Sequence, residues 1–414
     1  MKQSYDFNIK QIKNLSVEEK DFRQKNLDLF YKSGFPSKTI EDWKFTDLNL
    51  ILNKNFESIS NEVDFESTQE LETIENFKHN YIFLSNGKIT STSFVYEETN
   101  KILIKDFDQK ELTNFNSNNT LTLLNNALSS GGFSLEVAKN YKLKKPLIIY
   151  NYFSKGLKNK ILNNKNSIKL NEGSELTLIE YTNGYIQSNF IKNTLDIVSL
   201  DKDAVLKNIL IQKSKSNGHF YRYIKGSLES GSNYENYILS SGLKLNKIEI
   251  EINLNKDHSN CSIYSALNLV DDQHQEIKTL INHNSPNCKS HQKIKNVLND
   301  KSRGVYQGKI FVKKIAQKTD AYQLSKALIL NDDAEFDAKP ELEIYADDVK
   351  CSHGSTSGSI DSDAVHYLMT RGIAKKEAEK LLINGFLGEI LENIYISEVK
   401  TFLEEILERQ INGH

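Results

Sequence analysis

Short segments in which apolar and polar residues alternate dominate the chain from about residue 146 onward. The clearest is 248–254, where apolar residues occupy the even positions and polar residues the odd ones. An alternation of period two predicts a strand with one buried face. Successive segments begin roughly every 13–15 residues, the spacing of repeated strand-and-turn units. The segments are 175–181, 194–200, 205–212, 220–228, 234–239, 248–254, 263–269, 276–282, 293–298 and 305–312.

Two β folds fit this spacing equally well. An antiparallel sandwich places its turns at similar intervals, and a parallel β-helix stacks such units with their apolar faces inward. The chain contains four prolines, and so few suit a long unbroken ladder because each proline removes a backbone donor. The alternation therefore predicts a mainly β body and leaves the choice between the two folds open.

Helical patterns flank this body on both sides. Ser16 followed by Glu19 predicts a capping box at the start of a helix that ends near Gly34. After residue 360, apolar residues recur every three or four positions, which predicts a small module of amphipathic helices. We therefore expect three parts: an N-terminal helical and mixed domain over 1–145, a β core over 146–359 and a C-terminal helical module over 360–414.

The charge and cysteine content argue against several classes of protein. The 53 basic and 55 acidic residues leave a formal net charge of -2, which gives no electrostatic reason to expect nucleic acid as a partner. Three cysteines do not suit a disulfide-stapled secreted framework. Because the sequence shows no run of about 18 apolar residues and no signal-peptide pattern, we expect no membrane span and a cytoplasmic location.

The strongest candidate for a chemical site lies in the segment 340–354. If this segment is a strand, Cys351 and His353 are two residues apart and point to the same face. A thiolate and an imidazole on one face can bind iron or zinc, although the other ligands would have to come from elsewhere or from a partner chain. On spacing alone, a buried cysteine beside a hydrogen-bonded surface histidine explains the pair better.

Three weaker candidates are better explained by structure than by chemistry. Cys288 lies near His283 and His291, but no second ligand pair follows at finger-like spacing. Asp347 and Asp348 are adjacent, so on a strand they would point to opposite faces and would not share a substrate. The segment 304–310 fails as a phosphate-binding loop, because its glycine spacing is one residue short and no Ser or Thr follows the lysine.

Several longer motifs stand in a fixed order over roughly residues 270–391, within the segments 292–298, 303–310, 316–323, 342–354 and 367–373. A further motif at 41–47 contains Trp43, which we expect to be a packing residue. Together these motifs resemble the SufB/SufD family of iron–sulfur cluster assembly proteins. Within that family, the Cys-Ser-His-Gly form at 351–354 is similar to the SufD branch, since SufB carries a His-Glu pair there.

The resemblance implies a fold, partners and a role. The body would be a right-handed parallel β-helix, between an N-terminal helical segment and a C-terminal helical module. The chain would be a non-catalytic scaffold subunit that pairs with a SufB-like paralogue, docks a SufC-like ATPase through its C-terminal helices, and forms a homodimer when isolated. At the paired end, His353 matches the family's histidine at the cluster junction and Cys351 stands beside it. We expect no stably bound cofactor and only a transient iron–sulfur cluster.

A rival hypothesis is a carbohydrate-active β-helix enzyme, such as a polyuronate lyase or hydrolase. A lyase of this kind would need clustered acids, a basic residue and a secretion signal, and the sequence shows no such signal. Co-purification with an ATPase and an assay of polyuronate cleavage would separate the two hypotheses.

Overall fold

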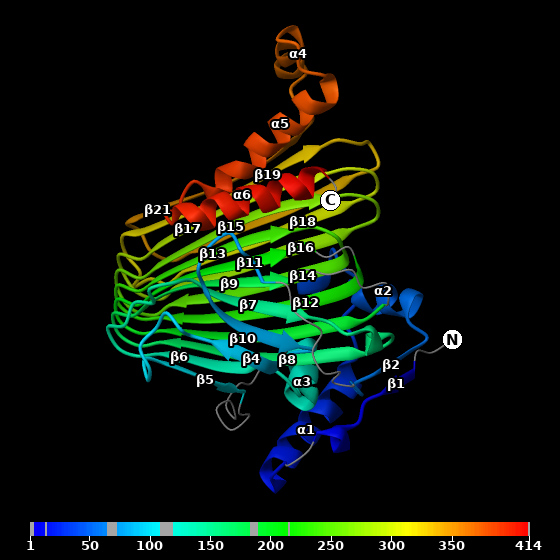
Figure 1. The fold of residues 1–414 in the computed structure, drawn as a ribbon, viewed down its shortest axis with the longest axis vertical. Coiled ribbons are helices and arrows are strands. Elements are labelled where there is room, and N and C mark those ends of the chain that lie inside the picture. The colour runs from blue at the N-terminus through cyan, green and yellow to red at the C-terminus, as the bar shows by residue number, and fades with distance from the viewer. Residues whose placement is uncertain are drawn as a thin grey trace.

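A computed structural model describes residues 4–12, 15–63, 73–107, 119–182, 189–213 and 216–412. The chain is mainly β, with 47% strand and 22% helix. Within the described residues, two large sheets form the body (Figure 1). The nine-stranded sheet has the order β20 (Glu335–Ile344), β18 (Arg303–Val312), β16 (His274–His283), β14 (Leu243–Leu254), β12 (Ser216–Leu228), β10 (Ile191–Leu200), β8 (Ile161–Leu170), β6 (Phe133–Val137) and β5 (Ile102–Asp106). The ten-stranded sheet has the order β21 (Val349–Gly358), β19 (Thr319–Ile329), β17 (Lys289–Leu298), β15 (Asn260–Leu269), β13 (Asn233–Ser240), β11 (Val205–Gln212), β9 (Glu175–Thr182), β7 (Leu147–Tyr152), β3 (Asn80–Ser85) and β4 (Lys88–Ser93).

From β6 onward, consecutive strands alternate between the two sheets, so each turn of the chain adds one strand to each sheet. β10 pairs in parallel with β8 on one side and β12 on the other, and Ile191 lies opposite Ile161 and His219. The body is therefore a β-solenoid of about 7 turns, which confirms the parallel β-helix. The sandwich alternative is wrong, because neighbouring strands in each sheet are one whole turn apart in the sequence and run parallel.

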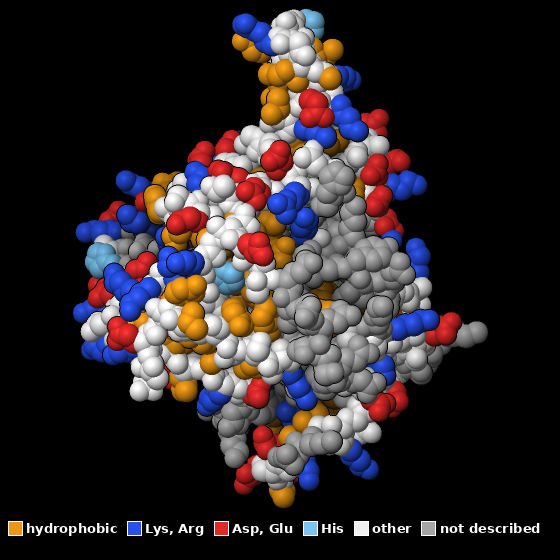
Figure 2. All heavy atoms as spheres, in the orientation of Figure 1, with side chains coloured by type: hydrophobic (Ala, Val, Ile, Leu, Met, Phe, Trp, Pro, Cys, Tyr) orange, Lys and Arg blue, Asp and Glu red, His pale blue; other side chains and the backbone are white. Residues whose placement is uncertain are grey.

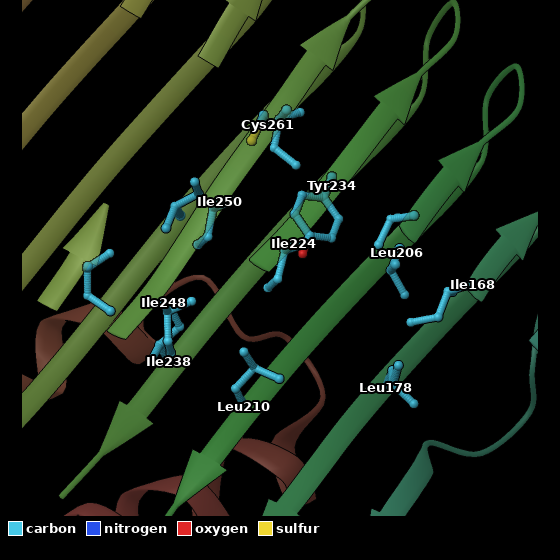
Figure 3. Close-up of a cluster of buried hydrophobic side chains, with 14 of the residues drawn as sticks. Ile168, Leu178, Leu206, Leu210, Ile224, Tyr234, Ile238, Ile248, Ile250 and Cys261 are labelled. Carbon is cyan, nitrogen blue, oxygen red and sulfur yellow. The ribbon is translucent and has the colours of Figure 1, made fainter. Parts of the chain in front are cut away.

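Apolar side chains from both sheets meet inside the β-helix (Figure 3). Ile248 and Ile250 of β14 pack there against residues such as Ile224 and Ile238, as the alternation predicted. Complete burial of each such side chain contributes about 1.5–3 kcal/mol. The polar residues between them, such as Glu249, point to the outer face of the sheet, where they meet charges from the neighbouring strands.

The turns that lead from the nine-stranded to the ten-stranded sheet stack on one another through one residue with positive φ. Gly173, Asp203 and Gly231 occupy this position in successive turns, with φ of 67°, 55° and 69°. The amide of Gly173 donates to the carbonyl of Lys202 (2.9 Å), and the amide of Asp203 donates to Ser230 in the turn above (2.9 Å). This repeated contact keeps successive turns in register.

The N-terminal elements pack on the outer face of the nine-stranded sheet, over strands β8 to β14. Ser16 and Glu19 form the predicted capping box at the start of α1. These elements are β1 (Ser4–Asp6), η1 (Ile9–Gln11), α1 (Val17–Ser33), η2 (Glu41–Trp43), α2 (Leu48–Asn55), β2 (Ser58–Ser60) and α3 (Thr120–Leu128).

The C-terminal helices take two different positions. The end of α5 (Lys375–Gly388), the short η5 (Glu389–Leu391) and α6 (Ser397–Asn412) pack on the outer face of the ten-stranded sheet. By contrast, α4 (Ser362–Thr370) and the start of α5 project beyond the body as an arm (Figure 1). Among the described residues, no helix combines the length and apolar character needed to cross a membrane. The predicted division at 145 and 359 stays a prediction.

Candidate functional site at the open end of the β-helix

The β-helix ends in two strands that are each paired on one side only. β20 pairs with β18 and β21 pairs with β19, and no strand of the described chain lies against their outer edges. Each edge is ten residues long. Long edges with unpaired backbone groups are ready to accept a strand from another chain.

Pro340 lies within β20, where a proline would normally interrupt the ladder. The amides of Glu335 and Tyr345 donate to carbonyls of the β18 side, Ser302 (3.0 Å) and Val312 (3.0 Å). Because backbone groups alternate in direction along a parallel strand, the amides of even-numbered residues in β20 face the open edge. Pro340 therefore leaves the ladder with β18 intact and removes one donor from the open edge.

β21 places Cys351 and His353 on one face, two residues apart. In the ladder, Cys351 lies opposite Ala321 and His353 lies opposite Gln323. Cys351 is half-buried among apolar side chains that include Ile310, and this burial raises the pKa of its thiol. His353 is exposed. Two such side chains supply half of a tetrahedral metal site.

A column of polar side chains lies inside the β-helix behind His353. Gln292 of β17 lies opposite Gln323 of β19, and Gln323 lies opposite His353 of β21. Both glutamines are buried. The hydroxyl of Tyr306 lies 3.1 Å from the Oε1 atom of each glutamine. The Nε2 atom of Gln323 donates to the carbonyl of Glu341 (3.0 Å), which fixes the amide directly below His353. The two glutamines are not among the candidates predicted from the sequence, because Gln292 lies just before the predicted strand 293–298 and Gln323 lies in no predicted strand.

The other predicted candidates do not converge. The thiol of Cys288 is buried in a turn and donates to the carbonyl of Lys256 (3.2 Å). His283 is buried inside the β-helix, whereas the ring of His291 lies against Tyr264 on the outer face. Within the part of the chain that the structure describes, no three His, Cys, Asp or Glu side chains form a group that could hold a metal ion.

The segments considered for phosphate binding and for acid catalysis have ordinary structural roles. Residues 304–310 lie within strand β18, so they form no phosphate-binding loop. Asp347 and Asp348 are exposed in the turn between β20 and β21, as expected for a solvated turn.

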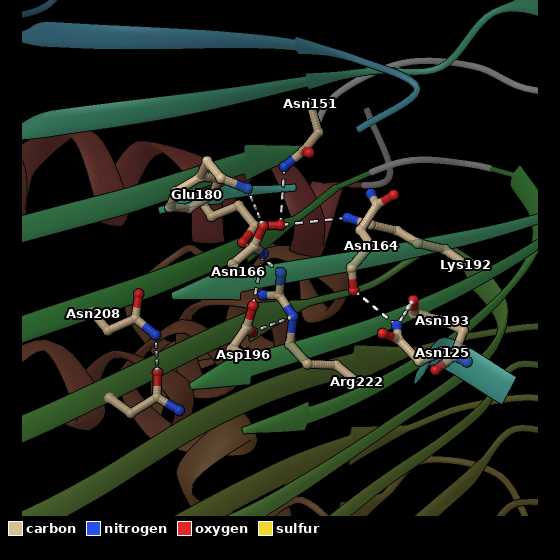
Figure 4. A network of polar contacts seen from close by, with 12 residues as sticks. Asn125, Asn151, Asn164, Asn166, Glu180, Lys192, Asn193, Asp196, Asn208 and Arg222 are labelled. Carbon is tan, nitrogen blue, oxygen red and sulfur yellow. Dashed lines mark hydrogen bonds and ion pairs between the residues drawn. The ribbon is translucent and has the colours of Figure 1, made fainter. Parts of the chain in front are cut away.

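A network of buried charges lies inside the earlier turns of the β-helix (Figure 4). Arg222 contacts Asp196 (Nε to Oδ2, 3.1 Å) and Glu180 (Nη2 to Oε2, 2.5 Å), and Lys192 lies 3.5 Å from Glu180. Burial opposes ionisation of Glu180, but the charges of Arg222 and Lys192 outweigh it and lower its pKa to about 2. A cavity of about 40 Å³ adjoins the network, large enough for water. The network joins three successive turns and so fixes their alignment.

The motif at 41–47 anchors the N-terminal segment to the nine-stranded sheet. Trp43 is buried, as expected of a packing residue, and the Nζ atom of Lys247 lies 4.4 Å from the centre of its ring. Lys247 also donates to the carbonyl of Asp42 (2.8 Å) and forms an ion pair with the buried Glu276. Lys339 of the edge strand β20 pairs with Glu41. The motif therefore reaches from the body to the open end.

Comparison with known proteins identifies the family. A family model described as "SUF system FeS cluster assembly, SufBD core domain" matches residues 152–386, and one for the "SufBD protein N-terminal region" matches residues 2–149. The chain belongs to the SufBD family.

The relatives of this SufBD-family chain include proteins named for iron–sulfur cluster assembly. It is 27% identical to the iron-sulfur cluster assembly protein SufD of Escherichia coli, over 89% of this chain and 88% of the relative. It is 27% identical to SufD of Bacillus subtilis, over 70% of this chain and 67% of that protein. A SufBD family protein of Synechocystis is 24% identical over 92% of this chain and 89% of the relative. The chain is SufD-like, which confirms the resemblance seen in its motifs.

Proposed function

We propose that this chain is a non-catalytic scaffold subunit that pairs with a SufB-like paralogue through the open edges of β20 and β21. The observation that carries the proposal is the pair of ten-residue edges at one end of the β-helix. A strand from a second chain would satisfy their backbone groups and bury the side chains beside them. Membership of the SufBD family supports a complex with other SUF proteins.

We propose that His353 binds the iron of the nascent cluster at this junction. It is exposed on the edge strand, so a paired chain could supply the ligands that the described residues lack. Cys351 is the second proposed ligand, and its raised pKa means that metal binding would have to displace the thiol proton. The cluster is cargo here and leaves with the recipient protein.

The projecting arm is the proposed docking site for a SufC-like ATPase. Tyr367, Met369 and Leu381 are 57%, 43% and 51% exposed on α4 and α5, and Figure 2 shows apolar side chains on this arm. An apolar surface of this kind, rimmed by charged residues, marks a protein interaction site.

The test is co-expression with the SufB-like and SufC-like proteins of the same organism. We expect His353→Ala to leave the complex intact on gel filtration and to lower its iron and sulfide content at least about tenfold, because removing even an outer partner of a metal ligand weakens metal binding about 10–100-fold. His258→Asn, at an exposed turn, is the matched control and should keep full cluster content.

Two results would count against the proposal. Cluster content unchanged by His353→Ala would remove that residue from the chemistry. Failure of the wild-type chain to co-purify with the SufB-like protein would remove the pairing itself.

A further inference from the structure

The outward face of β20 carries the side chains that a strand laid against this edge would meet. Phe336 and Leu342 of β20 pack toward the inside, so the odd-numbered residues face outward. Four of these five outward residues are acidic and one is basic: Glu335, Asp337, Lys339, Glu341 and Glu343. The edge strand is therefore strongly acidic on the face that continues the sheet.

The sheet below shows how successive strands match their charges. Opposite charges pair across neighbouring strands, either directly opposite or one step along the same face, and such cross-strand pairs stabilise a sheet. These pairs join Lys225 of β12 to Glu251 of β14 (3.5 Å), Lys278 of β16 to Glu249 of β14 (3.7 Å), and Lys309 of β18 to Glu343 of β20 (2.5 Å).

The acids of β20 are only partly balanced within the chain. β18 offers two cations for them: Arg303 contacts Glu335 (3.3 Å) and Asp337 (2.5 Å), and Lys309 contacts Glu343. Lys339 lies 3.5 Å from Glu341, but it also pairs with Glu41 of the N-terminal motif. Excess negative charge therefore remains along the open edge.

We propose that the strand which pairs with β20 carries Lys or Arg at alternate positions of its outward face. This inference rests on the pairing proposed above and adds the chemistry of the partner's strand. Basic side chains would continue the charge alternation of the sheet and balance the acids that β18 leaves uncompensated. Acidic side chains at the same positions would place like charges directly opposite each other, which disfavours pairing.

A second copy of this chain lacks that chemistry. If two β20 strands met antiparallel about Lys339, Glu335 would face Glu343, Asp337 would face Glu341, and Lys339 would face its own copy. Pairing of β20 with β21 of a second copy would offer a single basic outward residue, Lys350, among Ser, Gly and Thr. The outward charges therefore favour a distinct, basic partner strand over self-association through β20.

The first experiment measures binding of the SufB-like paralogue to variants of this edge. At about 50 mM salt, where screening is weak, we expect Glu341→Lys/Glu343→Lys to raise Kd at least about tenfold. Glu341→Gln/Glu343→Gln should raise it by a smaller factor. At about 500 mM salt the differences should shrink to within roughly threefold. Glu57→Lys/Glu62→Lys changes the charge equally at exposed positions beside β2 and should leave Kd unchanged.

The outcomes separate this inference from the pairing on which it rests. If the Lys and Gln variants bind the paralogue at low salt with the same Kd as wild type, the proposal of a basic partner strand is wrong. The pairing itself then stands. Each variant should unfold at a temperature within a few degrees of wild type, which shows that it is folded. If the Lys variant fails this check, the Kd of the Gln variant is compared with wild type instead.

If the wild-type chain does not bind the paralogue, the pairing proposal fails, and a second mixture tests separately whether the acidic edge of β20 prefers a basic strand. The probe is this chain with Glu335, Asp337, Glu341 and Glu343 all changed to Lys. Sedimentation at low salt should show more mixed dimer of wild type and probe than either homodimer. Absence of mixed dimers would overturn the inference.

Discussion

At the scale of single residues, histidines are buried on both faces of the nine-stranded sheet, His283 inside the β-helix and His219 on the outer face beneath the N-terminal elements. His219 and His283 are 2% and 0% exposed, and burial lowers the pKa of each to about 4. His283 lies 2.9 Å from the hydroxyl of Ser290, and His219 packs against the ring of Phe56. The folded protein therefore holds both imidazoles neutral at pH values where a free histidine begins to take a proton.

We predict that His219 and His283 each make the free energy of unfolding fall as the pH drops from about 6.5 toward 4. In this window the unfolded chain binds protons at its histidines and the folded chain does not, so stability is present above the window and is lost through it. Each histidine contributes a slope of about 1.4 kcal/mol per pH unit.

Urea unfolding at several pH values measures this slope. His283→Asn should reduce it by one histidine's share. An identical slope in wild type and His283→Asn would show that His283 does not titrate differently in the two states.

The residues that the sequence analysis could not find are those whose partners lie in another turn. Glu180, Asp196 and Arg222 come from three successive turns, and nothing in the local pattern around any one of them reveals the other two. Cys351 and His353, by contrast, are two residues apart on one strand, so their common face could be predicted from spacing alone. Their role stays a prediction.

At the scale of elements, the alternation predicted the buried faces correctly but shortened several strands. The segment predicted as 248–254 lies in β14, which begins at Leu243, and 220–228 lies in β12, which begins at Ser216. Polar residues can extend a strand because backbone hydrogen bonds, which do not depend on the side chain, pair it with its neighbours. The choice between sandwich and β-helix required the family resemblance, because the alternation does not reveal which strands pair.

Gly132 provides a test of how closely two elements approach. It leads into β6 with φ of 123°, and a Cβ atom added there would lie 1.8 Å from the backbone oxygen of Lys165 in β8. We predict that Gly132→Ala lowers the free energy of unfolding by about 3 kcal/mol, because the backbone must move and the residue is strained.

Gly34 is the matched control for this substitution. It also has positive φ, 69°, but an added Cβ would meet no atom within 4 Å. Gly34→Ala should cost less, about 1–2 kcal/mol, from the strain of this conformation alone (ψ of −171°). Equal losses in the two variants, measured by urea unfolding, would contradict the close approach at Gly132.

At the scale of the whole molecule, one buried lysine joins the C-terminal helices to the body. The side chain of Lys295 in β17 is 1% exposed, and its Nζ atom donates to the carbonyl of Phe386 (2.6 Å) and to Glu389 (2.6 Å). Lys293 lies 2.9 Å from Glu389 as well. Burial opposes ionisation of Glu389, but its hydrogen bonds with the two lysines lower its pKa to about 2. The projecting arm therefore meets the body at a charged anchor.

We predict that Lys295→Met loosens the end of α5, because the carbonyl of Phe386 and the carboxylate of Glu389 lose their common partner. Hydrogen exchange should become faster across residues 383–391, while strands β11 to β15 stay protected. Lys289→Met, an exposed position on the same strand, is the control and should change neither. Unchanged exchange at α5 in Lys295→Met would show that apolar packing alone holds the helix.

Helix α6 touches strands from several turns, and this limits how such a chain can change in length. Phe402 packs near Tyr181 of β9, while Gln410 contacts Gln212 of β11 and Asn268 of β15. An extra turn inserted between β9 and β15 would move these partners about 4.8 Å further apart and break the present set of contacts. A turn added beyond β17 would leave them undisturbed. The body can therefore be lengthened at its open end without breaking the contacts of α6, and each such addition would replace the surface offered to a partner.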